Sequence, residues 1–277
     1  MKKHITRRNV LRTLGVGAVG CVADAFFIEP NISTTTQKNL ILPNTPSSLE
    51  SLKVVQLTDF HYDPDSDDGL LESIVEKVNN ISPDLIFLTG DYIDEDPIVF
   101  DPLLKHLEKL KSTHGILACM GNHDGWNQRG SFFESGFSKI GVDLLINQNT
   151  ALTINGETLN IAATDYIWGG NPDPIRTLKG IPRDAPLITL VHEPDYFDTM
   201  LEYRDNHLQL SGHTHGGQCR VPLVGYAPVK VKYGKKYIYD TYMKQNSHLF
   251  VSRGIGTTGI PVRFACAPEI AVLTLQA

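Results

Sequence analysis

Two histidines stand one residue apart in the stretch SGHTHGGQC, residues 211–219. A histidine alone is more often a packed core or surface residue than a metal ligand. At the end of a strand, however, side chains alternate with period 2, so His213 and His215 would lie on the same face. The neighbouring glycines let the backbone turn and let another group approach closely. Because imidazole is the commonest metal-ligating side chain, this pair is a candidate for part of a metal site.

Other hydrophobic runs in the chain also end in short polar clusters. Functional sites in open α/β sheets form beyond the carboxyl ends of the strands, so clusters at several strand ends can meet. The five clusters are TDFH at 58–61, TGDYID at 89–94, GNHD at 121–124, VHEPD at 191–195 and GHTH at 212–215. They supply imidazole, carboxylate and amide ligands, namely Asp59, His61, Asp91, Asn122, His192, His213 and His215.

The chemistry of these side chains indicates which metals they would hold. Nitrogen and oxygen donors together suit Mn, Fe or Zn better than thiolate-selected metals or an all-oxygen calcium site. Seven ligands are too many for one tetrahedral metal, so they suit two divalent metal ions per chain that share one ligand. A carboxylate is the group best able to bridge two such cations.

The elements that would position the clusters alternate between strand and helix in the first half of the chain. Short apolar runs within 53–61, 83–91 and 115–124 predict buried strands. Apolar residues at helical spacing predict helices over Leu70–Ile81, Pro102–Lys111 and Ser131–Ile140.

The second half of the chain is mostly strand. A hairpin over 151–164 turns at Asn155-Gly156, which indicates that the sheet becomes antiparallel. Further strands are predicted within 143–148, 187–195, 208–217, 248–256 and 269–277. Together the elements predict an α/β domain with two packed mixed sheets and helices outside them.

The order of the five clusters resembles that of the calcineurin-like metallophosphoesterase superfamily, from about residue 53 to the C-terminus. The matching motifs are D-x-H at 59–61, GD-x-x-D at 90–94, GNHD at 121–124, the lone His192 and GH-x-H at 212–215. The resemblance implies a four-layer α-β-β-α sandwich and a dinuclear site. One metal would be held by Asp59, His61, Asp91 and His215, and the other by Asp91, Asn122, His192 and His213, with Asp91 as the bridge.

The resemblance also implies roles for two residues of the GNHD motif. His123 would lie near the phosphate and protonate the leaving oxygen, as a general acid does. Asp124 beside it, or Asp94, would orient the His123 ring. A capping or turn role for Asp94 and Asp124 stays equally open.

The N-terminus has the composition of a targeting segment. Residues 1–25 begin with five Lys or Arg and continue into the weakly apolar run 14–22, which is shorter than a membrane span. TRRNVL at 6–11 resembles the twin-arginine export motif, and Ala23-Asp24-Ala25 is a candidate cleavage site. Cys21 also lies in a loose resemblance to a lipoprotein box. We therefore expect an export signal or membrane anchor over 1–25, a linker or edge segment over 26–52 and a catalytic domain over 53–277.

The charge of the chain limits the classes of molecule that it is expected to bind. The formal net charge is −6 and the sequence pI is about 5.9, without the basic stripe that nucleic-acid binding needs. We therefore expect no nucleic-acid partner. The export-like N-terminus instead predicts contact with a bacterial membrane surface or the export machinery, on the periplasmic side if the segment is a twin-arginine signal.

Less specific stretches outside the five motifs suggest a subgroup of the superfamily and a substrate. HTHGGQ and SRGIGTTGIPVRFACAPEI at 252–270, with IEP at 28–30, resemble a bacterial subgroup that includes UDP-2,3-diacylglucosamine hydrolases of lipid A synthesis. This resemblance implies cleavage of a phosphodiester or pyrophosphate bond in a lipid precursor. The alternatives are a phosphodiesterase or phosphomonoesterase without lipid specificity, and a metal-binding scaffold without catalysis.

Three arginines in or near these stretches are candidates for substrate binding. Arg220, Arg253 and Arg263 carry guanidinium forks that suit a second phosphate, although a surface arginine is the favoured interpretation for each of them. Trp126 and Arg129 follow the GNHD motif and are candidates for the mouth of the pocket.

Overall fold

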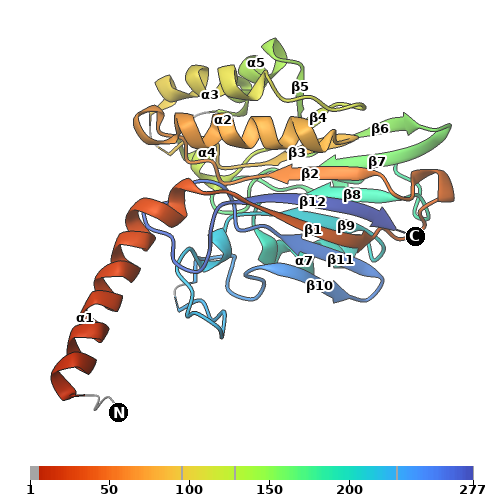
Figure 1. Ribbon diagram of the computed structural model, residues 1–277. Coiled ribbons are helices and arrows are strands. Elements are labelled where there is room, and N and C mark those ends of the chain that lie inside the picture. The colour runs from red at the N-terminus through yellow and green to blue at the C-terminus, as the bar shows by residue number, and fades with distance from the viewer. Residues whose placement is uncertain (1–5, 95, 128, 229, 277) are drawn as a thin grey trace.

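Two six-stranded sheets face each other, and helices lie on their outer faces (Figure 1). The chain is described by a computed structural model over residues 6–94, 96–127, 129–228 and 230–276. The predicted α/β architecture, with two packed mixed sheets and helices outside, is confirmed.

The first sheet has the strand order β1-β12-β2-β3-β4-β5. Its strands are β1 Thr34–Ile41, β2 Lys53–Leu57, β3 Leu85–Thr89, β4 Ile116–Cys119, β5 Val142–Leu144 and β12 Glu269–Gln276. Strands β2 to β5 pair in parallel, whereas β12 is antiparallel to β2 and parallel to β1. Strands β2, β3 and β4 are almost entirely buried, which explains why their sequences are continuous apolar runs.

Three helices cover the outer face of this sheet. They are α2 Pro64–Ile81, α3 Phe100–Leu107 and α5 Gly130–Lys139. The Asp63 carboxylate caps α2 by accepting the Asp65 N–H, and the left-handed Ser82 ends the helix. The apolar stripe predicted from residue 70 onwards packs against the sheet, but α2 begins earlier because its cap lies at Asp63. Helix α3 ends before the predicted Lys111.

The second sheet has the order β10-β11-β9-β8-β7-β6. Its strands are β6 Gln148–Ile154, β7 Glu157–Ala163, β8 Leu187–Leu190, β9 Leu208–Ser211, β10 Asp240–Lys244 and β11 Ser247–Val251. The expected antiparallel pairing is right for the β6–β7 hairpin. It is wrong for the middle of the sheet, where β7, β8, β9 and β11 are parallel. Only the short helices α6 Pro174–Thr177 and α7 Phe197–Tyr203 contribute to the outer layer here among the described residues.

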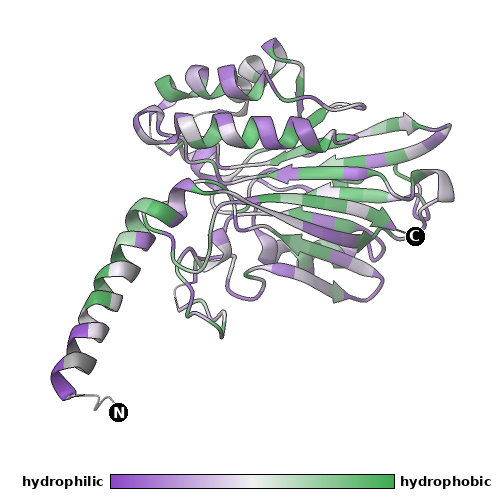
Figure 2. Cartoon of the chain, viewed as in Figure 1, coloured by the Kyte–Doolittle hydropathy of each residue, from purple (hydrophilic) through white to green (hydrophobic). Residues whose placement is uncertain are grey.

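The main core lies between the two sheets. Phe87 and Leu117 of the first sheet pack in one cluster with Leu190, Leu210 and Phe250 of the second. Apolar residues accordingly concentrate on the central strands, while the outer helices alternate in character (Figure 2). Such packing fixes the two sheets against each other, and it therefore fixes the strand ends that carry the polar clusters.

The N-terminal helix α1, Arg7–Ala23, projects from one end of the domain (Figure 1). It continues into helical turns over 24–31, and then into β1, which forms the edge of the first sheet. Among the described residues, none of the helices has the length and apolar character needed to cross a membrane. Residues 1–5 of the expected targeting segment lie outside the described residues.

Candidate metal centre

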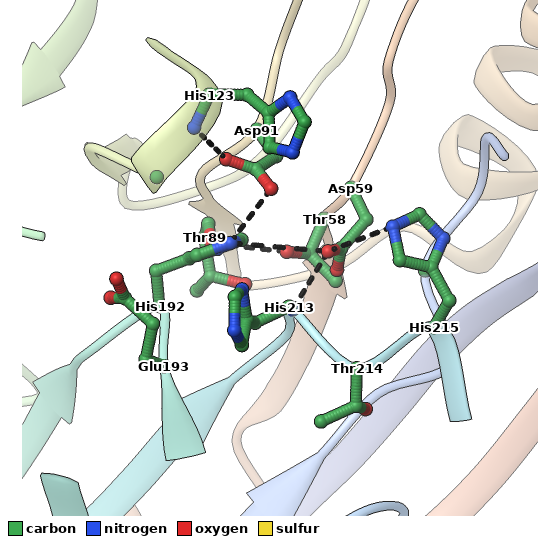
Figure 3. Close-up of polar contacts among 12 residues, drawn as sticks. Thr58, Asp59, Thr89, Asp91, His123, His192, Glu193, His213, Thr214 and His215 are labelled. Atoms are coloured by element: carbon green, nitrogen blue, oxygen red, sulfur yellow. Dashed lines mark hydrogen bonds and ion pairs between the residues drawn. The ribbon is translucent and has the colours of Figure 1, made fainter. Parts of the chain in front are cut away.

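Six of the seven predicted ligands bring their donor atoms together, in loops that follow parallel strands of both sheets. Figure 3 labels five of them, namely Asp59, Asp91, His192, His213 and His215. Asp59 and His61 follow β2, Asp91 follows β3, Asn122 begins the short helix α4 (Asn122–Asn127) after β4, His192 follows β8, and His213 and His215 follow β9. The parallel pairing explains this convergence, because it brings all of these carboxyl ends to one edge of each sheet.

Five of the candidate ligands have a left-handed backbone conformation. A left-handed φ costs a residue other than glycine of order 1–3 kcal/mol and persists only where surrounding contacts impose it. Hydrogen bonds between loops supply those contacts: the Phe60 N–H donates to the Asp91 carbonyl at 2.7 Å, and the Gly212 N–H donates to the His192 carbonyl at 3.0 Å. The strained ligands are Asp59 (54°), His61 (41°), Asp91 (53°), His213 (72°) and His215 (51°).

Asp91 lies between two groups of donor atoms. Asp59, His61 and His215 bring their donor atoms within 4.8 Å of one another, and so do Asp91, His192 and His213. A third group, formed by His61, Asp91 and His123, connects the two. Asp91 Oδ2 lies 3.0 Å from His192 Nε2 and 3.5 Å from His61 Nε2, so one oxygen faces both groups. This is the arrangement that a bridging carboxylate requires.

Several donor atoms at the centre have no hydrogen-bond partner among the described residues. They are Asp59 Oδ2 and both side-chain polar atoms of Asn122, and all are buried. Buried polar atoms without partners are rare and call for an explanation such as an ion. A cation would satisfy these atoms and would also offset the two buried carboxylates of Asp59 and Asp91. The residues present therefore fit divalent metal ions.

Hydrogen bonds on the far side of each ring fix which nitrogen faces the centre. His192 Nδ1 donates to the Thr89 carbonyl at 2.6 Å, and His213 Nε2 donates to the Lys232 carbonyl at 2.7 Å. The opposite nitrogens, His192 Nε2 and His213 Nδ1, are then free to act as donors to a metal. Burial lowers the pKa of His213 to about 3, so its ring is neutral, as a metal ligand must be. The neighbouring carboxylates of Asp91 and Asp59 instead raise the pKa of His192 despite its burial, so a metal would have to displace a proton from that ring.

The His123 ring is oriented by Asp94 rather than by Asp124. Asp94 Oδ1 lies 2.9 Å from His123 Nδ1 and 2.5 Å from His61 Nδ1. The Asp124 carboxylate instead accepts the backbone N–H groups of Asp91 (2.9 Å), Gly121 (2.8 Å) and Tyr92 (2.8 Å). Of the two roles left open for Asp124, the structure supports the turn role, because all these partners are backbone amides of the loops around Asp91. The expectation of a catalytic role for Asp124 is corrected accordingly.

The three arginines predicted to bind substrate make contacts within the fold. Arg263 is fully buried, and its guanidinium donates to the carbonyls of Gly256, Cys266 and Arg253. Arg220 donates to the Gly225 carbonyl at 2.9 Å, and Arg253 bonds to Glu269 at 3.1 Å. The substrate-binding interpretation is corrected for Arg263, because its side chain is fully buried, donates to carbonyls inside the fold and lies 3.5 Å from His215 Nδ1. Arg220 and Arg253 are partly exposed, and substrate binding by them stays a prediction.

Sequence reasoning missed Glu193, which lies directly after His192. Its carboxylate is buried, and Oε1 accepts the N–H groups of Ile167 (2.9 Å) and Trp168 (2.8 Å). This holds the Trp168 loop over the centre, where the Trp168 ring lies 6.3 Å from that of His213. Its position in the VHEPD cluster was the available signal.

Trp126 and Trp168 form a rim beside the site. Their rings meet edge to face at 4.8 Å, and the Trp126 ring lies 4.9 Å from that of His123. Trp126 and Arg129 also line a separate cavity of about 550 Å³, together with Met120, Ile146 and Tyr166. None of the candidate metal ligands lines this cavity, so a position of Trp126 and Arg129 at the mouth of the metal site stays a prediction.

Two further cavities open at the metal ligands. One of about 560 Å³ is lined by His61, Asp94 and His123 together with Val99 and Thr258. The other, of about 270 Å³, begins at Thr214 and His215 and is lined mainly by apolar residues, including Cys219, Val231, Ile260 and Val262. Thr258 lines both cavities, and the smaller one is the more apolar of the two.

Comparison with known proteins assigns the chain to a protein family. Residues 52–217, more than half of the chain, match the family described as "Calcineurin-like phosphoesterase". The chain belongs to this family. It is therefore a hydrolase that acts on phosphate esters, and its clustered donors indicate divalent metal binding.

Named relatives cover most of the chain. "Uncharacterized metallophosphoesterase YkuE" of Bacillus subtilis (strain 168) is 34% identical, over 99% of this chain and 99% of that protein. "Phosphodiesterase YaeI" of Escherichia coli (strain K12) is 31% identical over 80% of this chain and 82% of that protein. "UDP-2,3-diacylglucosamine pyrophosphatase LpxG" of Chlamydia trachomatis is 25% identical over 89% of this chain and 90% of that protein.

A solved structure shares the fold at low sequence identity. The protein TT1561 of Thermus thermophilus aligns with a TM-score of 0.50 and 12% identity, over 74% of this chain and 90% of that chain.

Proposed function

We propose that the chain hydrolyses a phosphodiester or pyrophosphate bond in a lipid precursor, with two divalent metal ions at the centre. One ion would be held by Asp59, His61, Asp91 and His215, and the other by Asp91, Asn122, His192 and His213. The position of Asp91 between two groups of donor atoms supports this division. Mn, Fe or Zn would suit the donor set.

The residues around the ions would each have a separate role in the reaction. When bound, two such ions supply positive charge to phosphoryl oxygens and lower the pKa of water toward neutrality. His123, whose side chain is 24% exposed, would hold a proton for the leaving oxygen. Asp94 would keep the His123 ring in position through its contact with Nδ1. Trp126 and Trp168 would restrict access of bulk water.

The observation that carries a lipid substrate is the apolar recess that begins at His215. A phosphate bound at the metals would leave an attached acyl chain free to enter the recess beside Val231, Ile260 and Val262. The similarity to a relative named as a UDP-2,3-diacylglucosamine pyrophosphatase supports the same substrate class.

A phosphodiesterase without lipid specificity is the second candidate. The relative named as a phosphodiesterase in Escherichia coli favours it, because it is more similar to this chain than the pyrophosphatase is. A scaffold without catalysis is less well supported, because all seven candidate ligands and His123 are present.

Hydrolysis of two substrates by the purified chain separates the first two candidates. We expect Mn²⁺-dependent release of UMP from UDP-2,3-diacylglucosamine, with a much higher kcat/KM than for bis(p-nitrophenyl) phosphate. Ile260→Asp should lower kcat/KM for the lipid and leave the small diester unaffected, because Ile260 is 64% exposed and lines only the recess. Hydrolysis of the diester alone would reject the lipid substrate.

We also propose that residues 1–25 direct the chain across or onto the bacterial membrane. The twin-arginine-like TRRNVL supports export, and the projecting helix α1 is accessible to such machinery (Figure 1). Replacing Arg7 and Arg8 by Lys should block export in cell fractionation. Unchanged delivery would reject the twin-arginine interpretation.

A further inference from the structure

A loop next to the metal centre combines exposed apolar residues with unpaired positive charge. This segment, residues 220–236, is called the basic loop below. It lies between His215 and the strand β10, and Figure 1 shows it at the same end of the domain as α1.

The tip of the basic loop exposes large apolar side chains to solvent. Leu223 is 108% exposed, Val224 76% and Tyr226 57%. The tip is held in this position because the Val221 N–H donates to the Tyr226 carbonyl and the Arg220 N–H donates to the Phe264 carbonyl, both at 2.8 Å. Its apolar side chains therefore project from an ordered turn.

A second apolar group lies beside the basic loop. Phe27 is 76% exposed and Ile28 50%, at the point where α1 joins the domain. Both groups are bonded to the same stretch, 263–266: Glu29 accepts the Ala265 N–H at 2.8 Å, and Arg220 reaches Phe264 as described above. The two apolar groups thus flank one short segment, and we call them together the docking face.

The segment that contains the basic loop carries positive charge, whereas the whole chain is negative. Residues 216–239 contain five Lys or Arg and no Asp or Glu, although the chain carries a net charge of −6. Lys236 pairs with Asp198. Within the described residues, the side chains of Lys230 and Lys235 form no ion pair, although the Lys235 N–H donates to Asp195 Oδ2 at 2.9 Å. The Lys232 ammonium lies 5.2 Å from the centre of the Trp168 ring, and Arg220 donates to the Gly225 carbonyl. Unpaired cations around exposed apolar side chains fit a surface that is both anionic and apolar.

We infer that the docking face binds the surface of a bilayer that contains anionic phospholipid. The apolar tips would enter the boundary between headgroups and acyl chains, while the lysines would face the phosphates. The Lys232 carbonyl accepts the hydrogen bond from His213, so the bound surface would lie close to the metal centre. The inference rests on the proposed membrane location and adds the face that makes the contact.

Vesicle binding by the full chain tests this inference. The probe is a phosphatidylcholine vesicle with or without phosphatidylglycerol, and the matched variants are Leu223→Ser with Val224→Ser and, as a control, Ile175→Ser with Met243→Ser. Ile175 and Met243 are 72% and 71% exposed but lie away from the docking face. We expect the loop pair to lower the partition coefficient on phosphatidylglycerol vesicles about tenfold or more, because buried apolar groups drive interfacial binding. The control pair should bind like the unmodified chain.

A double substitution of two lysines tests the electrostatic contribution to vesicle binding. Lys230→Gln with Lys235→Gln should weaken binding several-fold and reduce its dependence on salt, whereas the exposed pair Lys105→Gln with Lys109→Gln, in and just after α3, should have no effect. Hydrolysis of soluble bis(p-nitrophenyl) phosphate should be unchanged in every variant, which excludes misfolding.

Two results would overturn the inference. One is vesicle binding by the Leu223→Ser, Val224→Ser chain that equals that of the unmodified chain. The other is self-association of the unmodified chain without vesicles, abolished by the same pair in sedimentation experiments, which would assign the face to a second copy. Absence of hydrolysis with vesicle binding intact would reject the proposed function alone.

Discussion

Asp94 Oδ1 lies 2.9 Å from His123 Nδ1, and the same oxygen lies 2.5 Å from His61 Nδ1. Burial alone would raise the pKa of Asp94, but its hydrogen bonds with His123 and His61 hold that pKa well below its usual range. One ionised carboxylate therefore orients both a candidate metal ligand and the candidate general acid.

This shared contact predicts different effects for changes at His123 and Asp94. His123→Ala should lower kcat by about 10²–10⁴-fold and leave the metal content intact, because only the proton donor is lost. Asp94→Asn should lower activity and metal affinity together, about 10–100-fold, because it acts on His61 as well. Steady-state kinetics with metal analysis separates the two effects. Full activity of His123→Ala would contradict its role, and His114→Ala, outside every motif, serves as the control.

Gly121 lies against the predicted bridge. A Cβ built on Gly121 would clash with both the Oδ1 atom and the backbone nitrogen of Asp91. Gly121→Ala should therefore displace Asp91 and lower both activity and bound metal. Gly69→Ala, a helical position where a Cβ meets nothing within 4 Å, should retain both and be slightly more stable. Equal behaviour of the two variants would contradict the close approach.

Glu29 ties the N-terminal segment to the loop behind His215. Its carboxylate accepts the N–H groups of Ala265 and Cys266, and the Cys266 carbonyl accepts from the buried Arg263. Glu29→Gln should lower the free energy of unfolding by about 1.5–3 kcal/mol, the range for hydrogen bonds to charged groups. Urea denaturation measures the change, with the exposed Glu72→Gln as the control. A difference within error of that control would contradict the role of Glu29.

The sequence was sufficient to predict those strands that are continuous apolar runs and are buried in the fold. Strands such as Leu85–Thr89 are buried throughout and end in the polar clusters, so both the strand and its ligand could be predicted. The edge strand Thr34–Ile41 could not, because most of its side chains are exposed and polar. The parallel middle of the second sheet was missed because residues 164–186, which connect β7 to β8, contain only the short helix Pro174–Thr177.

In the site, too, some features could be predicted from the sequence and others could not. Motif order indicated which side chains should meet, but not which nitrogen of each histidine faces inward, since that depends on carbonyls of distant residues such as Thr89 and Lys232. The burial of Arg263 was also invisible, because an arginine whose partners are backbone carbonyls leaves no charged partner in the sequence.

The metal content of the chain tests the central claim most directly. After reconstitution with Mn²⁺ and removal of free metal, elemental analysis should find two metal ions per chain for the unmodified protein. Asp91→Ala should lose metal from both positions, because Asp91 Oδ2 faces both groups of donors. One metal ion in the unmodified chain, or two retained by Asp91→Ala, would contradict a dinuclear centre bridged by Asp91.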